Sequence, residues 1–196
     1  MHRRRFIGLL PALAAPSVRA ARLSSSSSSP WPLLERGGCI VLIRHAATLP
    51  GIGDPPGFSL AQCSTQRNLS RAGRFDAARI GTAFRKHAVR ISAVLSSRWC
   101  RCIDTAQLAF GRVQRVVMLD SMFVDDAAAR QAKLAAVRSY VTSLKGHGNV
   151  VMVTHDVNIR ALVGRYAEPG TLIIASRGAG GTLAVEMAIP IAALDA

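Results

Sequence analysis

Residues 40–50 read IVLIRHAATLP, which is four aliphatic residues followed by an Arg-His pair and a short stretch ending in proline. Two glycines, Gly37 and Gly38, precede this segment. A short aliphatic run bounded by glycine predicts a strand that is buried on both faces of a sheet. Arg44 and His45 therefore stand where that strand ends.

The rest of the chain repeats the pattern of aliphatic runs separated by stretches of helical periodicity. Further strands are predicted in RISAVLSS (90–97), VQRVVMLD (113–120), NVVMVTH (149–155), TLIIAS (171–176) and TLAVEMAI (182–189). Helices are predicted in 70–89 with Ser70 as N-cap, 98–111 closed by Gly111, 127–144 and 157–165. This alternation predicts an α/β protein, a three-layer α/β/α sandwich with a largely parallel central sheet.

The N-terminal residues have the composition of an export signal. Residues 1–20 combine a cationic start, an apolar run and small residues near a cleavage site, and Arg3-Arg4 resembles the twin-arginine signal of bacteria. The apolar run is too short to span a bilayer, so we expect no stable membrane span after signal removal. A serine-rich flexible linker over 21–33 and a single domain over 34–196 complete the predicted organisation, and the predicted location is periplasmic or secreted.

The charge of the chain indicates an anionic partner. The 25 Lys and Arg residues against 11 Asp and Glu give a formal net charge of +14, and the excess is almost all arginine. Arginine donates paired hydrogen bonds to phosphate and carboxylate groups. We see no basic stripe with interleaved aromatic residues, so nucleic acid is not the expected partner. The oligomeric state is left open by the sequence.

The four cysteines are Cys39, Cys63, Cys100 and Cys102. In an oxidising compartment a disulfide is expected. Cys100 and Cys102 are too close in sequence to pair well, which favours a bridge from one of them to Cys63, although three complete pairings are possible. The spacing does not match a zinc site.

Polar residues gather where three of the predicted strands end. In open α/β sheets, ligands bind beyond the carboxyl ends of the strands. Two buried arginines at that edge would repel each other without an anion between them. The residues at these ends are Arg44 and His45; Ser96, Ser97 and Arg101; and Thr154, His155 and Asp156.

These segments resemble the histidine phosphatase superfamily. IRHAAT resembles the family's Arg-His-Gly segment, with Ala46 in place of glycine. LSSRWCRCIDTAQLAF is similar to its second block through Arg101, Thr105 and Ala106, and VVMVTHDVNIRAL to its third through His155. CSTQRNLSRAGRFDAARIG further resembles a periplasmic subgroup that includes the Ais-type lipopolysaccharide core heptose phosphatases.

The resemblance implies a mechanism for the strand-end residues. His45 would be the nucleophile that forms a phosphohistidine, and Arg44, Arg101 and His155 would bind the phosphoryl oxygens. Thr48 would add a hydroxyl, unless it is an ordinary turn residue. No metal or other cofactor is expected, because the arginines supply the positive charge.

The proton donor for the leaving oxygen is ambiguous. One branch of the superfamily supplies a carboxylate from the segment after the third strand, where this chain offers Asp120, Asp125 and Asp126. Another branch places an aspartate directly after the second histidine, as Asp156 is placed here. We slightly favour Asp125 or Asp126. The structural alternative for Asp125 and Asp126 is N-capping of the following helix.

The sequence thus predicts an exported phosphatase that hydrolyses phosphomonoesters, with a phosphorylated small molecule or glycan as partner, such as a sugar or lipopolysaccharide phosphate. Two alternatives remain. A phosphomutase is disfavoured by the export signal and the short chain. A non-catalytic phosphate or polyanion binder would keep the pocket without the proton donor.

Overall fold

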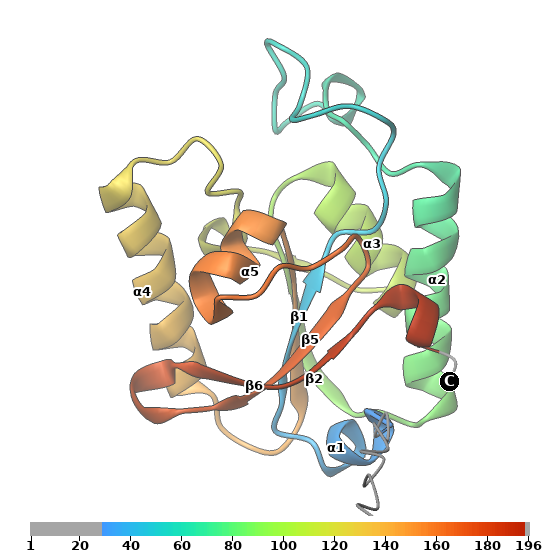
Figure 1. The fold of residues 1–196 in the computed structure, drawn as a ribbon, viewed down its shortest axis with the longest axis vertical. Helices are drawn as coiled ribbons and strands as arrows, with labels where there is room; N and C mark the ends of the chain where they lie inside the picture. Colours follow the sequence, from blue (N-terminus) through green and yellow to red (C-terminus); the bar gives the residue numbers. More distant parts are fainter. Residues whose placement is uncertain (1–28, 195–196) are drawn as a thin grey trace, which may run out of the picture.

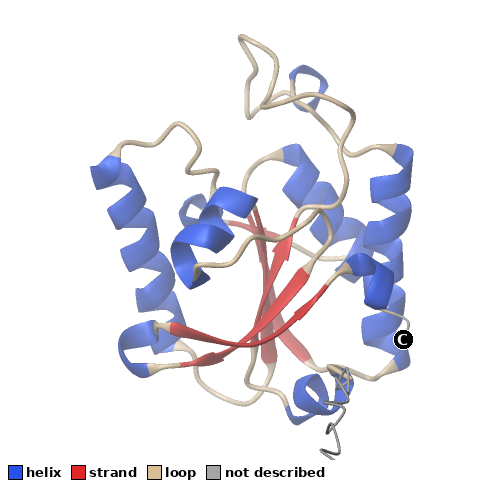
Figure 2. Cartoon of the chain, in the orientation of Figure 1, coloured by secondary structure: helices blue, strands red, loops and turns tan. Residues whose placement is uncertain are grey.

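The computed structural model describes residues 29–194, in which a six-stranded sheet lies between two layers of helices (Figures 1 and 2). The predicted signal peptide and most of the predicted linker lie outside these residues. The helices are α1 Trp31–Arg36, α2 Arg71–Lys86, α3 Cys100–Phe110, α4 Ala127–Ser143 and α5 Asp156–Val163. The strands are β1 Ile40–Arg44, β2 Ile91–Ser96, β3 Gln114–Arg115, β4 Asn149–Thr154, β5 Leu172–Arg177 and β6 Leu183–Ile189.

The sheet has the order β3-β2-β4-β1-β5-β6. Strands β3, β2, β4 and β1 run parallel. At the β1 side, β5 pairs antiparallel with β1, and β6 pairs antiparallel with β5. The central pair is in register, with Arg44 opposite Thr154. The prediction of a three-layer α/β/α sandwich with a largely parallel sheet is therefore confirmed.

Each face of the sheet packs on its own helices, as alternate residues of β1 show. Val41 and Ile43 join a cluster with α1, α2 and α3, whereas Ile40 and Leu42 join a cluster with α4 and α5. All four side chains are at most 1% exposed, as expected for a strand covered on both faces. This two-sided burial fixes β1 rigidly and so fixes the residues that follow it.

Local signals set the start of α2 and the end of α3 as predicted, and Asp126 has the capping role that the sequence left as the alternative to proton donor. The Ser70 hydroxyl accepts a hydrogen bond from the Gly73 amide at 3.0 Å and begins α2. Gly111 ends α3 in the left-handed conformation, φ 68°, which glycine adopts without strain. The Asp126 carboxylate caps α4 by accepting from the Ala129 amide at 2.7 Å.

Two segments differ from expectation. The predicted strand over 113–120 is paired only at Gln114–Arg115, and a 3₁₀ turn follows at Val117–Leu119. The pairing stops at Arg115 because its partner strand β2 ends at Ser96, and the Leu119 carbonyl then accepts from the Thr154 hydroxyl at 2.7 Å. Trp31, placed in the predicted linker, is 4% exposed and stacks on His87 with ring centroids 4.1 Å apart.

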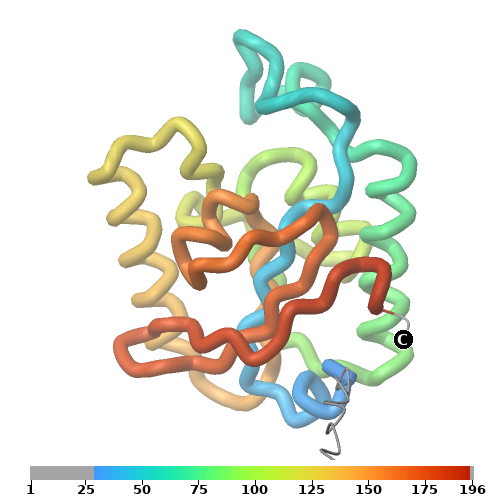
Figure 3. The backbone as a smooth tube through the Cα atoms, in the orientation of Figure 1, coloured from blue at the N-terminus to red at the C-terminus, as the bar shows by residue number. Residues whose placement is uncertain are grey.

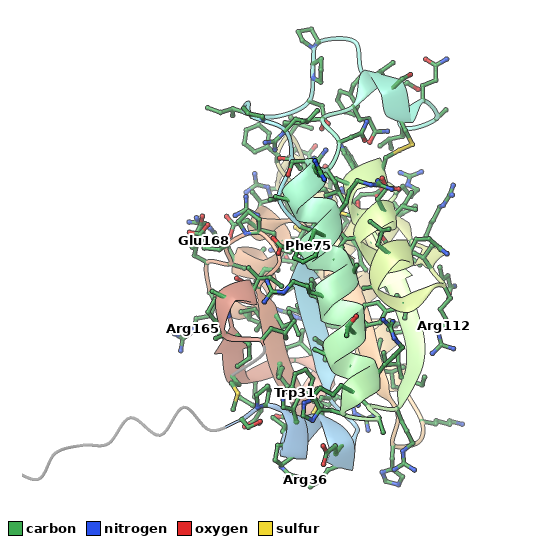
Figure 4. The ribbon with its side chains drawn as sticks, turned by 90° about the vertical axis from the view of Figure 1, so that its right-hand side faces the viewer. Trp31, Arg36, Phe75, Arg112, Arg165 and Glu168 are labelled. Carbon is green, nitrogen blue, oxygen red and sulfur yellow. A yellow bond between two sulfur atoms is a disulfide. The ribbon has the colours of Figure 1, made fainter. Side chains whose placement is uncertain are left out.

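A long loop, residues 47–69, extends from the carboxyl edge of the sheet and stands above the rest of the molecule in Figure 3. The Cys63–Cys100 disulfide ties it to the start of α3. That bond is yellow near the top of Figure 4. The predicted disulfide from Cys63 to either Cys100 or Cys102 is confirmed, and Cys100 is the partner. Cys39 and Cys102 are buried free thiols.

Candidate active site

His45 lies directly beyond β1, and its imidazole is buried and held at Nδ1. Its backbone amide donates to the Thr154 carbonyl at 2.9 Å, which continues the pairing of β1 with β4. The imidazole is 4% exposed, with Nδ1 2.9 Å from the Ala46 carbonyl oxygen. Because a carbonyl only accepts, Nδ1 carries the proton and Nε2 keeps its lone pair.

The surroundings of His45 keep it neutral. Burial, followed by the positive charges of Arg101, Arg44 and Arg67, lowers the pKa of His45 to about 3. A neutral imidazole is the nucleophilic form. At neutral pH, His45 therefore needs no base to remove a proton from Nε2.

His155 follows β4 at the start of α5, beside His45. The two ring centroids lie 5.5 Å apart in an edge-on arrangement. His155 Nε2 lies 2.9 Å from the Ser97 hydroxyl, which comes from the end of β2. Burial, together with the charges around it, lowers the pKa of His155 well below its usual value. Three neighbouring strand ends thus supply His45, His155 and Ser97, as the sequence predicts.

Three arginines surround the histidines, and they are held in the same way. Each has one terminal nitrogen, Nη1, hydrogen-bonded to a protein oxygen: Arg44 to Ala167 O at 2.8 Å, Arg67 to Gly51 O at 2.7 Å and Arg101 to Asp54 Oδ1 at 2.7 Å. Each also has a buried Nε–H with no hydrogen-bond partner among the described residues. Buried N–H groups are rarely left unpaired in proteins.

Asp54 anchors the arginine cluster from the long loop. Its carboxylate forms an ion pair with Arg101, in which the two side chains are 7% and 5% exposed. It also accepts from the indole of Trp99 at 2.9 Å and from the backbone amide of Arg67 at 2.9 Å. Burial acts to raise the pKa of Asp54, but these hydrogen bonds and the Arg101 charge lower it overall. Asp54 is therefore a fixed negative charge.

The sequence did not single out Asp54 and Arg67. Both lie in the long loop, where neither strand nor helix periodicity places a side chain. The two residues meet Arg101 because the Cys63–Cys100 disulfide and a hydrogen bond from the Cys100 amide to Gln66 fold the loop onto α3. The only available signal was the basic and polar segment around Cys63.

The candidate proton donors have different partners. Asp126 caps α4, and Asp156 accepts from Arg160 at 2.7 Å and from the Ala167 amide at 3.1 Å. Asp120 is buried and bound by Arg98 and Ser97. Asp125 pairs with Lys133 at 2.6 Å, and the charge of Lys133 is among those that lower the pKa of His155.

The remaining predicted residue, Thr48, lies in the long loop and pairs through its backbone with Leu69. Among residues 29–194 no group of three or more His, Cys, Asp and Glu side chains is placed to hold a metal ion. In the same part of the chain, every helix is too short or too polar to cross a bilayer.

Neutral histidines and clustered arginines at the carboxyl edge of a parallel sheet define a site suited to phosphoryl groups. Residues 40–125 match the model of the histidine phosphatase superfamily, branch 1, and this segment holds His45, Arg44, Arg101 and Asp125. His155 lies beyond it. The matched segment thus carries the sequence pattern of that superfamily, which contains phosphatases and mutases. No curated protein sequence matches the chain significantly.

Solved structures share the fold at low sequence identity. YhfR of Bacillus stearothermophilus is 19% identical with a TM-score of 0.61, covering 76% of this chain and 95% of that one. An alpha-ribazole phosphatase from Shigella flexneri is 17% identical with a TM-score of 0.55, covering 78% and 96%. The protein histidine phosphatase SixA, complexed with tungstate, is 12% identical with a TM-score of 0.54, covering 79% and 97%. These similarities establish the histidine phosphatase fold.

Proposed function

We propose that this protein is a phosphatase that hydrolyses phosphomonoesters through a phosphohistidine at His45. The observation that carries the proposal is the state of the His45 imidazole, neutral and held through Nδ1 by the Ala46 carbonyl, with Nε2 left as the nucleophile. Three arginines act on the same ring, so an anionic group is attracted to the nitrogen that attacks it.

The reaction has two displacements. In the first, the Nε2 lone pair forms a bond to phosphorus while the bond to the leaving oxygen breaks, and that oxygen takes a proton from an acidic group. In the second, water attacks phosphorus and gives a proton back to the group that acted as acid, while the phosphorus–nitrogen bond breaks, its electron pair returns to Nε2 and inorganic phosphate is released. The guanidinium groups and His155 stabilise charge on the three equatorial oxygens in both steps.

Export and substrate class are parts of the same proposal. The signal-like residues 1–20 support an exported bacterial enzyme, and the Cys63–Cys100 disulfide is consistent with an oxidising compartment. Resemblance to the Ais-type subgroup and the arginine-rich composition support an exposed phosphate on a sugar or a lipopolysaccharide core. Among the named structural neighbours, one is a protein histidine phosphatase and another an alpha-ribazole phosphatase. A phosphate-release panel of sugar phosphates, small phosphomonoesters and phosphohistidine peptide ranks these substrates.

The His45→Ala variant tests the nucleophile. With p-nitrophenyl phosphate as substrate, we expect kcat to fall by about 10³-fold or more, because the covalent route is removed. The acid-labile phosphate that is trapped on the wild-type protein when the reaction is quenched should be absent from the variant. His147→Ala, which changes an exposed loop histidine, is the matched control and should keep full activity. Phosphate binding without turnover by the wild-type protein would instead identify a binder.

A further inference from the structure

Arg67 is the one arginine of the cluster that neither a strand end nor a helix supplies, since Arg44 ends β1 and Arg101 lies in the first turn of α3. It comes from the long loop, yet its charge acts on His45 together with those of Arg101 and Arg44. The Arg67 backbone amide and the Arg101 guanidinium both donate to Asp54 Oδ1, at 2.9 and 2.7 Å, so the two arginines are neighbours. Burial, together with repulsion from Arg101 and Arg44, lowers the pKa of Arg67, while the Asp54 charge acts to raise it. Among the described residues the only side-chain hydrogen bond of Arg67 is to the Gly51 carbonyl, and the Asp54 charge that favours its cationic form is already paired with Arg101.

The hydrogen bonding of the cluster shows which edge of each arginine is free. Arg44, Arg67 and Arg101 are each fixed through Nη1, and each leaves a buried Nε–H without a protein acceptor. These three nitrogens make up most of the buried unpaired side-chain atoms of the described residues. A guanidinium that offers Nε–H alongside a terminal N–H binds phosphate oxygens in a paired geometry. A phosphoryl group with several acceptor oxygens would satisfy all three.

The charges agree with this geometry. Three guanidinium charges against the single carboxylate of Asp54 leave an excess of two positive charges, with both histidines neutral. A phosphomonoester carries a charge of about −1.5 to −2 at neutral pH. Without Arg67, the charges of Arg44, Arg101 and Asp54 would leave an excess of only one positive charge.

We infer that Arg67 is a third phosphate-binding arginine, which contacts the phosphoryl oxygens from the loop side. Asp54 is a positioning residue, because its carboxylate accepts hydrogen bonds from the Arg101 guanidinium and from the Arg67 backbone amide. This inference rests on the proposed phosphoryl site at His45 but not on its turnover. The site is thereby matched to a doubly charged phosphoryl group and disfavours phosphodiesters, which carry one charge.

Equilibrium binding of inorganic phosphate to the purified full chain tests the inference without any need for catalysis. We expect Arg67→Ala to weaken phosphate binding about tenfold or more, because a charge-assisted hydrogen-bond pair is lost. Arg74→Ala is the matched control. Arg74 is an exposed arginine in the first turn of α2, paired with Asp104, and its loss should change affinity less than about twofold.

Two further variants separate phosphate binding from loop anchoring. Arg67→Lys keeps the charge, so it should bind phosphate more tightly than Arg67→Gln, which keeps an N–H donor for Gly51 but no charge. If the loop contact were the real role, Arg67→Gln would bind like wild type and the inference would be overturned. Phosphate affinity within twofold of wild type in Arg67→Ala would overturn it equally. If wild type binds phosphate without turning over p-nitrophenyl phosphate, the proposed function fails while the assignment of Arg67 is still decided.

Discussion

Asp125 is distinguished from the other candidate proton donors by its neighbours. Asp126 is engaged as a helix cap, and both oxygens of Asp156 accept hydrogen bonds from other groups. Asp125 instead pairs with Lys133, whose positive charge contributes to lowering the pKa of His155. This places the Asp125–Lys133 pair on the α4 side of the histidines.

If Asp125 protonates the leaving oxygen, Asp125→Asn should lower kcat for an alkyl phosphate by about 10²-fold or more. The loss should be much smaller for p-nitrophenyl phosphate, whose leaving group needs little help from a proton. Asp126→Asn keeps a side-chain acceptor for the α4 cap and serves as control. Equal losses for both substrates would contradict the role, and the same measurements on Asp156→Asn would then decide for its rival.

The predictability of single residues followed from their distance to a strand. Arg44, His45 and His155 could be assigned because each directly follows an aliphatic run whose end is easy to recognise. Arg101 needed only one further turn of helix. Asp54 and Arg67 could not be placed, because a loop without periodicity gives no direction to its side chains, and only the folded chain brings them to Arg101.

At the scale of elements, the loop over residues 47–69 is the least regular part of the site and the most tightly fastened. It is joined to α3 by the Cys63–Cys100 disulfide, by the Cys100–Gln66 hydrogen bond and by Asp54 with its partners. The sequence reduced the favoured disulfide pairings to two, Cys63 with Cys100 or Cys63 with Cys102. It could not choose between Cys100 and Cys102, because that depends on which face of α3 meets the loop. Cys102 points instead toward His155, at 3.5 Å from Nε2.

Removing the disulfide should loosen the loop and the site together. The bond spans a sequence separation of 37, so its loss in Cys63→Ser/Cys100→Ser should lower the free energy of unfolding by up to about 4 kcal/mol. We also expect KM for p-nitrophenyl phosphate to rise, since Asp54 and Arg67 lie within the released segment. Urea unfolding and steady-state kinetics with and without dithiothreitol give the measurement. Dithiothreitol should lower the free energy of unfolding and raise KM in the wild type but leave the double variant unchanged. If dithiothreitol changes neither quantity in the wild type, the disulfide does not hold the loop and the site together.

At the scale of the whole molecule, the buried histidines make global stability depend on pH. The pKa of His45 is about 3 in the folded protein against about 6.5 in an unfolded chain. Between these values the unfolded chain binds more protons. The free energy of unfolding is therefore highest above pH 6.5 and falls as the pH drops from 6.5 toward 3, with His155 adding a change of the same sign.

The His45→Asn variant should weaken this dependence. Going from pH 7.5 to 4.5, it should lose up to about 2–3 kcal/mol less stability than wild type in urea unfolding, because one histidine contributes at most about 1.4 kcal/mol per pH unit. His147→Ala should keep the wild-type profile. An identical pH dependence in His45→Asn would mean that His45 accepts a proton readily in the folded protein.

The architecture as a whole was the easiest level to predict. The order of strands and helices follows from the switch between aliphatic runs and helical periodicity, and the caps at Ser70 and Asp126 mark two helix starts. The length of the edge strand β3 was overestimated, since an apolar run does not reveal the register that leaves only Gln114 and Arg115 opposite β2. Trp31 was placed in the linker because its partner, His87, is distant in sequence.

The register of β1 with β4 has a consequence for how such a site can diversify. Arg44 lies opposite Thr154, so His45 and His155 emerge one residue further on from adjacent strands. The backbones of the two histidines are thereby held near the spacing of hydrogen-bonded strands, about 4.8 Å, and their rings lie 5.5 Å apart. A substitution within either strand cannot move these two backbones apart without breaking the ladder. We therefore expect variation in the size of the site to arise in the surrounding loops, while the backbone separation of the two histidines stays constant.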